Sequence, residues 1–405
     1  MAAGKTGIYI HIPFCVKKCN YCAFLSFDAE ISPRKEYSEA LCEEIRLRAA
    51  SMKESGDTRS IDTVYIGGGT PSVLDVSQMR DIMHTLRTCF DIKKDAEITL
   101  EANPATLGRK DGVMLAKLQA YKYIGVNRLS MGVQSMDGGR LHFLGRIHTP
   151  ENVIRDMKLA RDKGFDNINL DLMFSVPGET KEDALRDLGA ILAMEPEHIS
   201  CYSLQIEEGT SFARMIESGE MTEVPDEEDR ETYHAICSRL REAGYEHYEI
   251  SNFTKPGYRS RHNSLYWDMS DYIAFGLGAS GFVNNTRYKN VSDIEEYMRI
   301  IGSGELPVDE IHENTPFDNI SEAVFTGLRR QEGISYADAI AAYGRVCPKE
   351  EPAAAARERF WEVFKEAKEE AESFQRQGLL IIDEEGLRLT EQGIDISNAI
   401  MALFV

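Results

Sequence analysis

Six short apolar runs rich in β-branched and aromatic residues recur along the first half of the chain, each of them the length of a buried strand. Between them, apolar residues repeat every three or four positions, as in residues 37–50, 77–90 and 181–194, a pattern typical of amphipathic helices. Alternating strands and helices predict a parallel sheet with right-handed crossovers. Six units fall short of the eight of a closed barrel, so we expect an α/β fold, a partial (βα)6 TIM-like barrel. The runs begin near Gly7, Asp62, Glu97, Val126, Asn167 and His198.

The last hundred residues have a different pattern. From about Lys349, a charged and alanine-rich stretch predicts one long surface helix whose apolar stripe packs against a core. Residues 378–405 have the pattern of a short hairpin followed by a final helix, which predicts a winged-helix-like C-terminal unit. We therefore expect two domains, residues 1–300 and residues 301–405. The stripe consists of Phe360, Phe364, Ala367, Ala371 and Phe374.

The composition is that of an ordinary globular protein, with 42% hydrophobic and 28% charged residues in a chain of 405. The formal net charge of -21 repels phosphate backbones, so we do not expect nucleic acid as a partner. The N-terminus lacks a signal-peptide pattern, and no uninterrupted apolar stretch has the length of about 18 residues that a transmembrane helix needs. We expect a soluble cytoplasmic protein.

Three of the eight cysteines, Cys15, Cys19 and Cys22, lie together directly after the first predicted strand. Three thiolates cannot complete a tetrahedral zinc site, and no histidine follows at zinc-finger spacing. They can hold three irons of a [4Fe-4S] cluster and leave the fourth iron open to another ligand. A zinc site with a distant fourth ligand and three unrelated thiols are the alternatives. The other five, Cys42, Cys89, Cys201, Cys237 and Cys347, are scattered and are expected to pack as small hydrophobic residues.

Polar residues follow or end several of the predicted strands. A run of three glycines, residues 67–69, follows the second strand, where the absence of side chains lets the backbone approach a ligand closely; a plain tight turn is the alternative. Parallel barrels place their sites at the C-terminal ends of their strands, so polar groups there converge on one mouth. The polar residues at these ends are Glu101, Gln134, Asp171 and Gln205.

The C-x3-C-x2-C spacing, together with the GGGTP sequence at Gly67, resembles the radical S-adenosylmethionine superfamily. YIHIPFC, GGGTPS, LEANP, NRLSMGVQS, NLDLMFSVPGET and RHNSLYW are similar to motifs of the oxygen-independent coproporphyrinogen oxidase and HemW subgroup along almost the whole chain. The resemblance implies a [4Fe-4S] cluster on the three cysteines and S-adenosylmethionine at its open iron.

The resemblance also implies roles for individual residues. Arg146 suits a carboxylate through its fork of donors, and Asp171 suits ribose hydroxyls as an acceptor. Gln205 and Phe282 match less securely. The residues implied to bind S-adenosylmethionine are Tyr9, Tyr21, Gly68, Gly69, Thr70, Glu101, Gln134, Arg146 and Asp171.

One departure separates the oxidases of this subgroup from the HemW haem chaperones. The oxidases carry a further cysteine two positions after the third, where this chain has Phe24. They also have an N-terminal extension, whereas 14 residues precede Cys15 here. Both features favour a haem chaperone that delivers haem to acceptor proteins, such as respiratory enzymes at the membrane. A coproporphyrinogen III oxidase acting by radical chemistry is the alternative, and an iron–sulfur electron carrier or sensor is a third.

The segment from Arg261 to Trp267 resembles the H-N-x-x-Y-W motif that is associated with haem binding in HemW. A neutral imidazole ligates haem iron well, and Tyr266 and Trp267 offer flat surfaces to a porphyrin. His262 is therefore the candidate haem ligand. The alternative is that it forms hydrogen bonds inside a packed aromatic corner.

Overall fold

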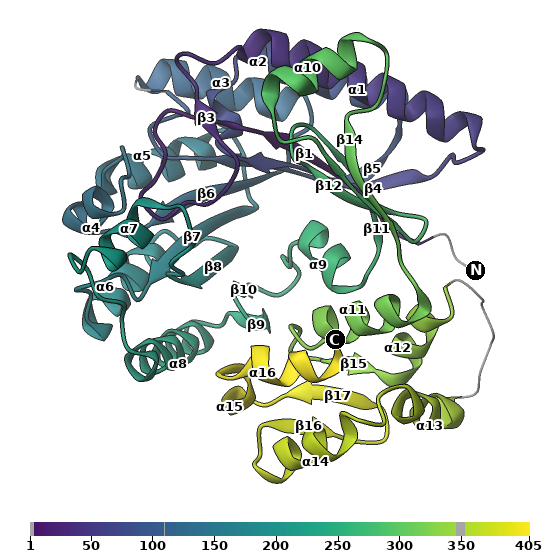
Figure 1. Ribbon diagram of the computed structural model, residues 1–405. Coiled ribbons are helices and arrows are strands. Elements are labelled where there is room, and N and C mark those ends of the chain that lie inside the picture. Colours follow the sequence, from purple (N-terminus) through teal and green to yellow (C-terminus); the bar gives the residue numbers. More distant parts are fainter. Residues whose placement is uncertain (1–3, 109, 346–352) are drawn as a thin grey trace.

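The computed structural model describes residues 4–108, 110–345 and 353–405. A curved sheet forms its largest part, and all six predicted strands occur in it (Figure 1). A seventh parallel strand, β11, pairs with β1 and was not predicted. In spatial order the parallel strands are β11 (Asp271–Phe275), β1 (Thr6–Ile12), β4 (Ser60–Gly68), β5 (Asp91–Ala102), β6 (Arg128–Gln134), β7 (Ile168–Phe174) and β8 (His198–Ser203).

Antiparallel strands extend both edges of the parallel sheet. β12, β13 and β14 continue outward from β11, whereas β10 and β9 continue from β8. Over the described residues, the outermost strands β14 and β9 do not pair with each other, so the barrel stays open. The predicted α/β fold with a partial barrel is confirmed. These strands are β9 (Glu246–Glu249), β10 (Asn252–Thr254), β12 (Ser280–Val283), β13 (Thr286–Asn290) and β14 (Val308–Glu313).

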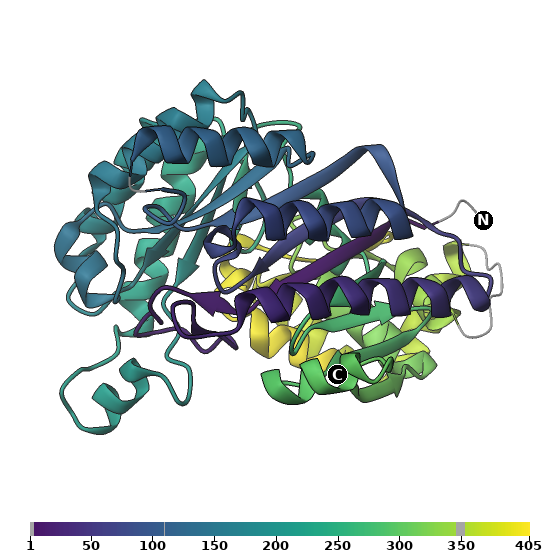
Figure 2. The ribbon, with the colours of Figure 1, turned by 90° about the horizontal axis from the view of Figure 1, so that it is seen from above.

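Helices cover the convex face of the sheet (Figures 1 and 2). Their ends follow local chemistry: Thr149 and Asn152 form a capping box at the start of α5, whose residues Val153, Met157 and Ala160 face the core. The covering helices are α1 (Arg34–Glu54), α2 (Val76–Cys89), α3 (Asp111–Tyr123), α5 (Pro150–Asp162), α6 (Lys181–Leu192), α8 (Asp226–Glu242) and α10 (Ile294–Gly302). Shorter elements near the barrel mouth are β2 (Phe14–Cys15), β3 (Phe27–Asp28), η1 (Pro71–Val73), α4 (Gly138–Phe143) and α7 (Ser211–Glu217).

The concave interior is closed at the N-terminal ends of the strands by a short helix, α9 (Arg261–Trp267), which packs against β1 and β4 (Figure 1). Glu97 of β5 anchors this helix, because its carboxylate accepts hydrogen bonds from the backbone N–H groups of Arg261 and His262 at 3.1 and 3.0 Å. A carboxylate at a helix N-terminus also meets the positive end of the helix dipole. The RHNSLYW segment therefore forms the floor of the barrel.

The C-terminal unit is helical around a small antiparallel sheet of order β15-β17-β16. The predicted long helix is wrong in one respect: it divides into α13 and α14, and its expected beginning near Lys349 lies outside the described residues. The predicted core packing is confirmed, since Phe360, Phe364 and Ala371 are buried. The elements are α11 (Pro316–Gly327), β15 (Ile334–Ser335), α12 (Tyr336–Tyr343), α13 (Ala353–Val363), α14 (Lys368–Arg376), β16 (Leu380–Ile382), β17 (Gly386–Leu389), α15 (Glu391–Ile394), α16 (Ser397–Met401) and η2 (Ala402–Phe404).

The division between residues 300 and 301 stays a prediction. The large sheet itself continues to Glu313 through β14. Polar contacts join the two parts: the Arg329 guanidinium lies 4.7 Å from the Trp267 ring centroid, and Arg330 pairs with Asp268 at 2.5 Å. The C-terminal unit therefore packs against the helix that closes the barrel floor.

A fully buried carboxylate ties helices α1 and α10, strand β13 and the turn after β11 together. Glu44 of α1 accepts hydrogen bonds from the Tyr297 hydroxyl at 2.6 Å, and from the Gly276 N–H and the Asn290 side chain at 2.8 Å each. Arg48 lies 3.5 Å from it. Because every partner is itself buried, loss of the carboxylate leaves several polar groups unsatisfied.

We expect Glu44→Ala to lower the free energy of unfolding by about 3 kcal/mol or more, since it removes one partner of a buried ion pair. Urea unfolding followed by circular dichroism measures this. Glu39→Ala, on an exposed part of the same helix, is the matched control and should change stability by about 0.5 kcal/mol or less. Equal effects of the two substitutions would contradict the structural role of Glu44.

Candidate functional site

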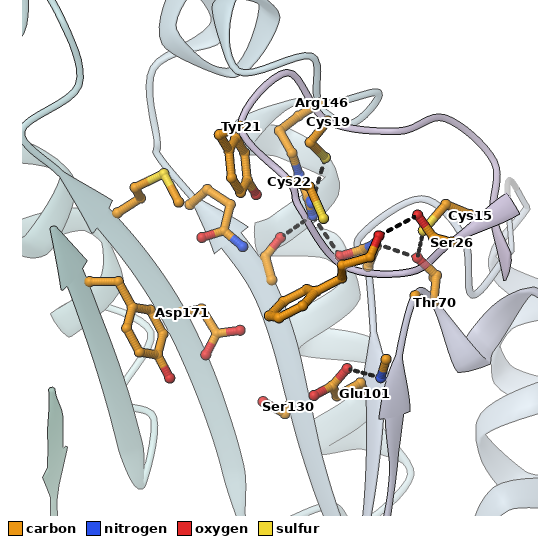
Figure 3. Close-up of a pocket in the computed structure, with 18 of the residues that line it drawn as sticks. Cys15, Cys19, Tyr21, Cys22, Ser26, Thr70, Glu101, Ser130, Arg146 and Asp171 are labelled. Carbon is orange, nitrogen blue, oxygen red and sulfur yellow. Dashed lines mark hydrogen bonds between the residues drawn. The ribbon is translucent and has the colours of Figure 1, made fainter. Parts of the chain in front are cut away.

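A deep cavity of about 730 Å³ opens at the C-terminal ends of the parallel strands, beside the loop that carries the cysteine cluster (Figure 3). Its size lies within the range of small-molecule and cofactor sites. Most of the residues predicted for the site line it, whereas Tyr9, His262 and Phe282 do not. The predicted residues in its wall are Cys15, Cys19, Tyr21, Cys22, Gly68, Gly69, Thr70, Glu101, Gln134, Arg146, Asp171 and Gln205.

The cysteine loop is tied to the barrel rim at its start and at Cys19. Buried Phe14 anchors its start, and its carbonyl accepts a hydrogen bond from the Thr70 N–H at 2.8 Å. The Thr70 hydroxyl donates to the Cys15 sulfur at 3.5 Å, and the Arg146 guanidinium donates to the Cys19 sulfur at 3.4 Å (Figure 3). All three thiols of the loop are half-buried and form no disulfide. Donors therefore already point at two of the sulfurs, while burial raises the pKa of the Cys15 thiol above its ordinary value.

The glycine turn after β4 packs directly against β1 and the start of the cysteine loop. Gly68 has a φ of +109°, and a Cβ there would lie 2.5 Å from the His11 ring. A Cβ on Gly69 would lie 2.8 Å from the Phe14 carbonyl oxygen. These glycines are required by the packing of the turn itself, as well as by any ligand that approaches it.

Two carboxyl groups face the cavity from β5 and β7. Glu101 accepts a hydrogen bond from the Tyr65 hydroxyl at 2.7 Å and from the Gly68 N–H at 3.1 Å, and Asp171 accepts one from the Asn169 side chain at 2.7 Å. Burial raises the pKa of Glu101 to about 7, and it also raises the pKa of Asp171. Glu101 thus holds its proton far more readily than an exposed glutamate does.

Arg146 reaches the cavity from the segment after α4. One of its nitrogens donates to the Asn103 side chain at 2.6 Å and to the Gly132 carbonyl at 2.5 Å. The adjacent strand is irregular, because the register of β6 with β7 shifts between Gly132 and Gln134. Gln134 has a φ of +69°, an uncommon conformation for a residue other than glycine. Backbone strain of this kind gathers at functional sites, and here it occurs at the cavity wall.

Sequence reasoning missed the residues that line the deeper part of the cavity. They face the interior because side chains alternate along a strand, so residues two or four positions before a predicted site residue point the same way. Counting back along the strands in steps of two residues from Gln134 and from Asp171 would have identified several of them. The missed residues include Tyr65, Asn103, Arg128, Ser130, Asn169, Ser200 and Tyr202.

His262 lies in the barrel floor and is 0% exposed. Its Nδ1 lies 2.7 Å from the Thr63 hydroxyl and its Nε2 lies 2.9 Å from the Tyr266 hydroxyl, while its ring stacks on Tyr65 with centroids 5.2 Å apart. Burial, together with the charge of Arg128, lowers the pKa of His262 to about 3, so the ring is neutral. The role of His262 as a haem ligand stays a prediction. Binding of haem iron to a ring nitrogen would have to replace one of these two hydrogen bonds.

Tyr9 and Phe282 do not line the cavity either. The Tyr9 hydroxyl is 3.0 Å from Nδ1 of His11, and its ring stacks on Tyr65 with centroids 6.3 Å apart. Phe282 of β12 is buried beneath the guanidinium of Arg287. The structure thus brings Tyr9 against a residue of the cavity wall, and its implied contact with S-adenosylmethionine stays a prediction.

Comparison with known proteins identifies the family. Residues 9–190 match the radical SAM superfamily, and residues 348–396 match the HemN C-terminal domain. The chain is 34% identical over 398 residues to the heme chaperone HemW of Bacillus subtilis strain 168, covering 98% of each chain. This chain belongs to the HemW family. It is also 39% identical over 280 residues to the heme chaperone HemW of Escherichia coli K12, covering 68% of this chain and 70% of that protein.

Solved structures support the fold of this HemW family member. Coproporphyrinogen III oxidase (HemN) from Escherichia coli, a radical SAM enzyme, matches with a TM-score of 0.81 and 22% identity over 99% of this chain and 90% of that chain. At this identity the likeness concerns the fold alone. No helix among the described residues is long and apolar enough to cross a membrane.

The raised pKa of Glu101 predicts how the stability of the ligand-free protein depends on pH. A carboxyl with a folded-state pKa near 7 contributes stability that is fully present below its unfolded value of about 4.5 and is lost as the pH rises through about 7. Relative to Glu101→Gln, the wild type should lose about 3 kcal/mol between those pH values. Unfolding free energies of both proteins across pH 4.5–8 measure this, and a constant difference between them would contradict it.

Proposed function

We propose that the chain is a haem chaperone that binds a [4Fe-4S] cluster, S-adenosylmethionine and haem, and that it delivers haem to haem-requiring proteins in the cytoplasm or at the membrane surface. The observation that carries the proposal is the position of three free thiols on a loop at the mouth of a cavity whose wall holds the glycine turn. The similarity to relatives that are named heme chaperone HemW supports haem as the cargo.

The thiols fit an iron–sulfur cluster better than a single metal ion. In the described part of the chain, no three cysteine, histidine, aspartate or glutamate side chains are grouped to hold one ion. Thiols spread along a loop, with Thr70 and Arg146 donating to sulfur, suit the separated corners of a [4Fe-4S] cube. Cys15, Cys19 and Cys22 would hold it, and a bound cluster would supply the electron for cleaving S-adenosylmethionine.

The cavity wall offers complementary groups to S-adenosylmethionine. Gly69 and Thr70 face the cysteine loop, where the methionine part would lie, and Glu101 and Asp171 offer acceptors farther along the wall. Tyr21, Gly68, Gln134 and Arg146 complete the proposed set. Burial of these groups excludes water and strengthens each polar contact.

The choice of chaperone over oxidase depends on the cysteine loop. Phe24 occupies the position at which the oxidases have a further thiol, and this residue is 70% exposed at the cavity rim. An exposed phenyl ring offers an apolar surface to a flat ligand and cannot bind iron. A coproporphyrinogen III oxidase remains the second candidate, because the same cavity wall would serve radical chemistry on a tetrapyrrole.

Anaerobic reconstitution tests the cluster. We expect Cys19→Ser to lose the iron content and the visible absorbance of the cluster while keeping a native circular dichroism spectrum, because Cys19 lies on a half-buried loop outside the hydrophobic core. Cys89→Ser, a half-buried cysteine at the end of α2, is the matched control and should reconstitute as the wild type does. Full iron loading of Cys19→Ser would contradict the assignment.

Haem titration followed by absorbance tests the cargo and the role of His262. Because the Tyr266 hydroxyl occupies Nε2 of the imidazole, we expect Tyr266→Phe to tighten haem binding several-fold and His262→Ala to weaken it. His84→Ala, at an exposed position on α2, is the control. Unchanged affinity in both variants would remove His262 as a ligand. Formation of 5'-deoxyadenosine and protoporphyrinogen IX from coproporphyrinogen III, without stable haem binding, would establish the oxidase instead.

A further inference from the structure

The wall of the cavity contains a buried cation, Arg128, that has no hydrogen-bond or ion-pair partner among the described residues. Arg128, at the start of β6, is 2% exposed and is among the largest fully buried side chains of the protein. Its Nε has no hydrogen-bond partner, and its guanidinium forms no ion pair with any described residue. A buried charge is costly unless it is paired and hydrogen-bonded, so this position calls for an explanation.

A second orphaned group lies beside it. Thr99 of β5 is directly opposite Arg128 in the strand register, and its buried hydroxyl also lacks a hydrogen-bond partner. Two unsatisfied polar groups on adjacent strands thus lie at the same depth of the barrel. Of these two residues, Arg128 lines the cavity and Thr99 does not.

Neither acid of the cavity is hydrogen-bonded to this arginine, although the charge of Arg128 acts on both and favours their ionised forms. Glu101 receives its hydrogen bonds from Tyr65 and Gly68, and Asp171 receives one from Asn169. Glu101, Asp171 and Ser130 face the same space (Figure 3). The hydrogen bonds to these two acids come from other residues, so the guanidinium of Arg128, which lines the same cavity, forms none with them.

Arg146 lines the same cavity but, unlike Arg128, has hydrogen-bond partners. Its guanidinium donates to Asn103, to the Gly132 carbonyl and to the Cys19 sulfur, so it is satisfied without any ligand. Lys17 and Lys18 line the mouth at exposed positions, where water solvates them. Among the described residues that line the cavity, Arg128 is therefore the buried cation that needs an external acceptor.

We infer that Arg128 is an anchor for a carboxylate group that enters the cavity from its mouth. A planar guanidinium binds a carboxylate through two parallel hydrogen bonds, and the match is stronger where water is excluded. Two sources of this chemistry are available, the propionate arm of a tetrapyrrole and a small free organic acid. The first source rests on the proposed function and deepens it, because it gives the cargo a contact distinct from His262.

Ligand-free stability provides the first test and requires no haem. If Arg128 is an uncompensated buried charge, Arg128→Met should keep or raise the melting temperature of the full chain, because the apolar side chain has no desolvation cost. Arg80→Met, at an exposed position on α2, is the control for loss of one positive charge. A fall of several degrees in Arg128→Met alone would show a structural counter-charge and would overturn the inference.

Carboxylate probes provide the second test. Succinate at millimolar concentration should raise the melting temperature of the wild type and of Arg80→Met, but not that of Arg128→Met, whereas neutral succinamide should raise none of them. Arg128→Lys keeps the positive charge but lacks the planar guanidinium, so succinate should raise its melting temperature only weakly. An equal succinate response in the wild type and in Arg128→Met would overturn the inference.

Haem and its dimethyl ester distinguish the two sources. We expect the wild type to bind haem about 10- to 100-fold more tightly than the ester, and Arg128→Met to bind both equally. An Arg128-dependent succinate response without this preference would support the anchor and identify a small organic acid as its ligand. The same response in a protein that binds no haem would refute the proposed function and leave the anchor standing. Loss of both the Arg128-dependent succinate response and the preference for haem over its ester would overturn the inference.

Discussion

The structure depends on how the polar side chains inside its open barrel find hydrogen-bond partners. Outward-facing residues of the parallel strands, such as Ile8 and Ile10, are fully buried, while many residues that face the interior are polar. A parallel sheet tolerates such an interior only if each polar group finds a partner or a ligand. The α9 helix supplies the partners at the floor, and the open mouth leaves room for ligands.

A continuous chain of contacts connects the floor to the mouth. Thr63 and Tyr266 hold His262, the His262 ring stacks on Tyr65, and the Tyr65 hydroxyl binds Glu101. Glu101 in turn accepts the Gly68 N–H of the glycine turn. The histidine of the H-N-x-x-Y-W motif therefore supports the wall of the proposed cofactor site, whatever its role toward haem. The C-terminal unit reinforces this floor from outside through Arg329 and Arg330.

The strands, most of the helices and the cysteine loop could be predicted because their signals are local. Apolar runs, capping residues such as Thr149 and the spacing of three cysteines are properties of neighbouring positions. The strand β11 was missed because its five residues, Asp271–Phe275, carry no amphipathic period and follow directly on α9. The break between α13 and α14 was missed because the apolar stripe continues through it from Phe364 to Ala371.

The sequence by itself determined the order of most strands and helices, the cysteine loop, the glycine turn and the family. The tertiary structure decided which polar residues are satisfied. His262 looks available in the sequence, yet its ring nitrogen bonds Thr63, a residue 199 positions away. Arg128 looks like an ordinary strand residue, yet the fold buries it without a hydrogen bond to its Nε. Hydrogen-bond satisfaction depends on neighbours in space, which local periodicity does not encode.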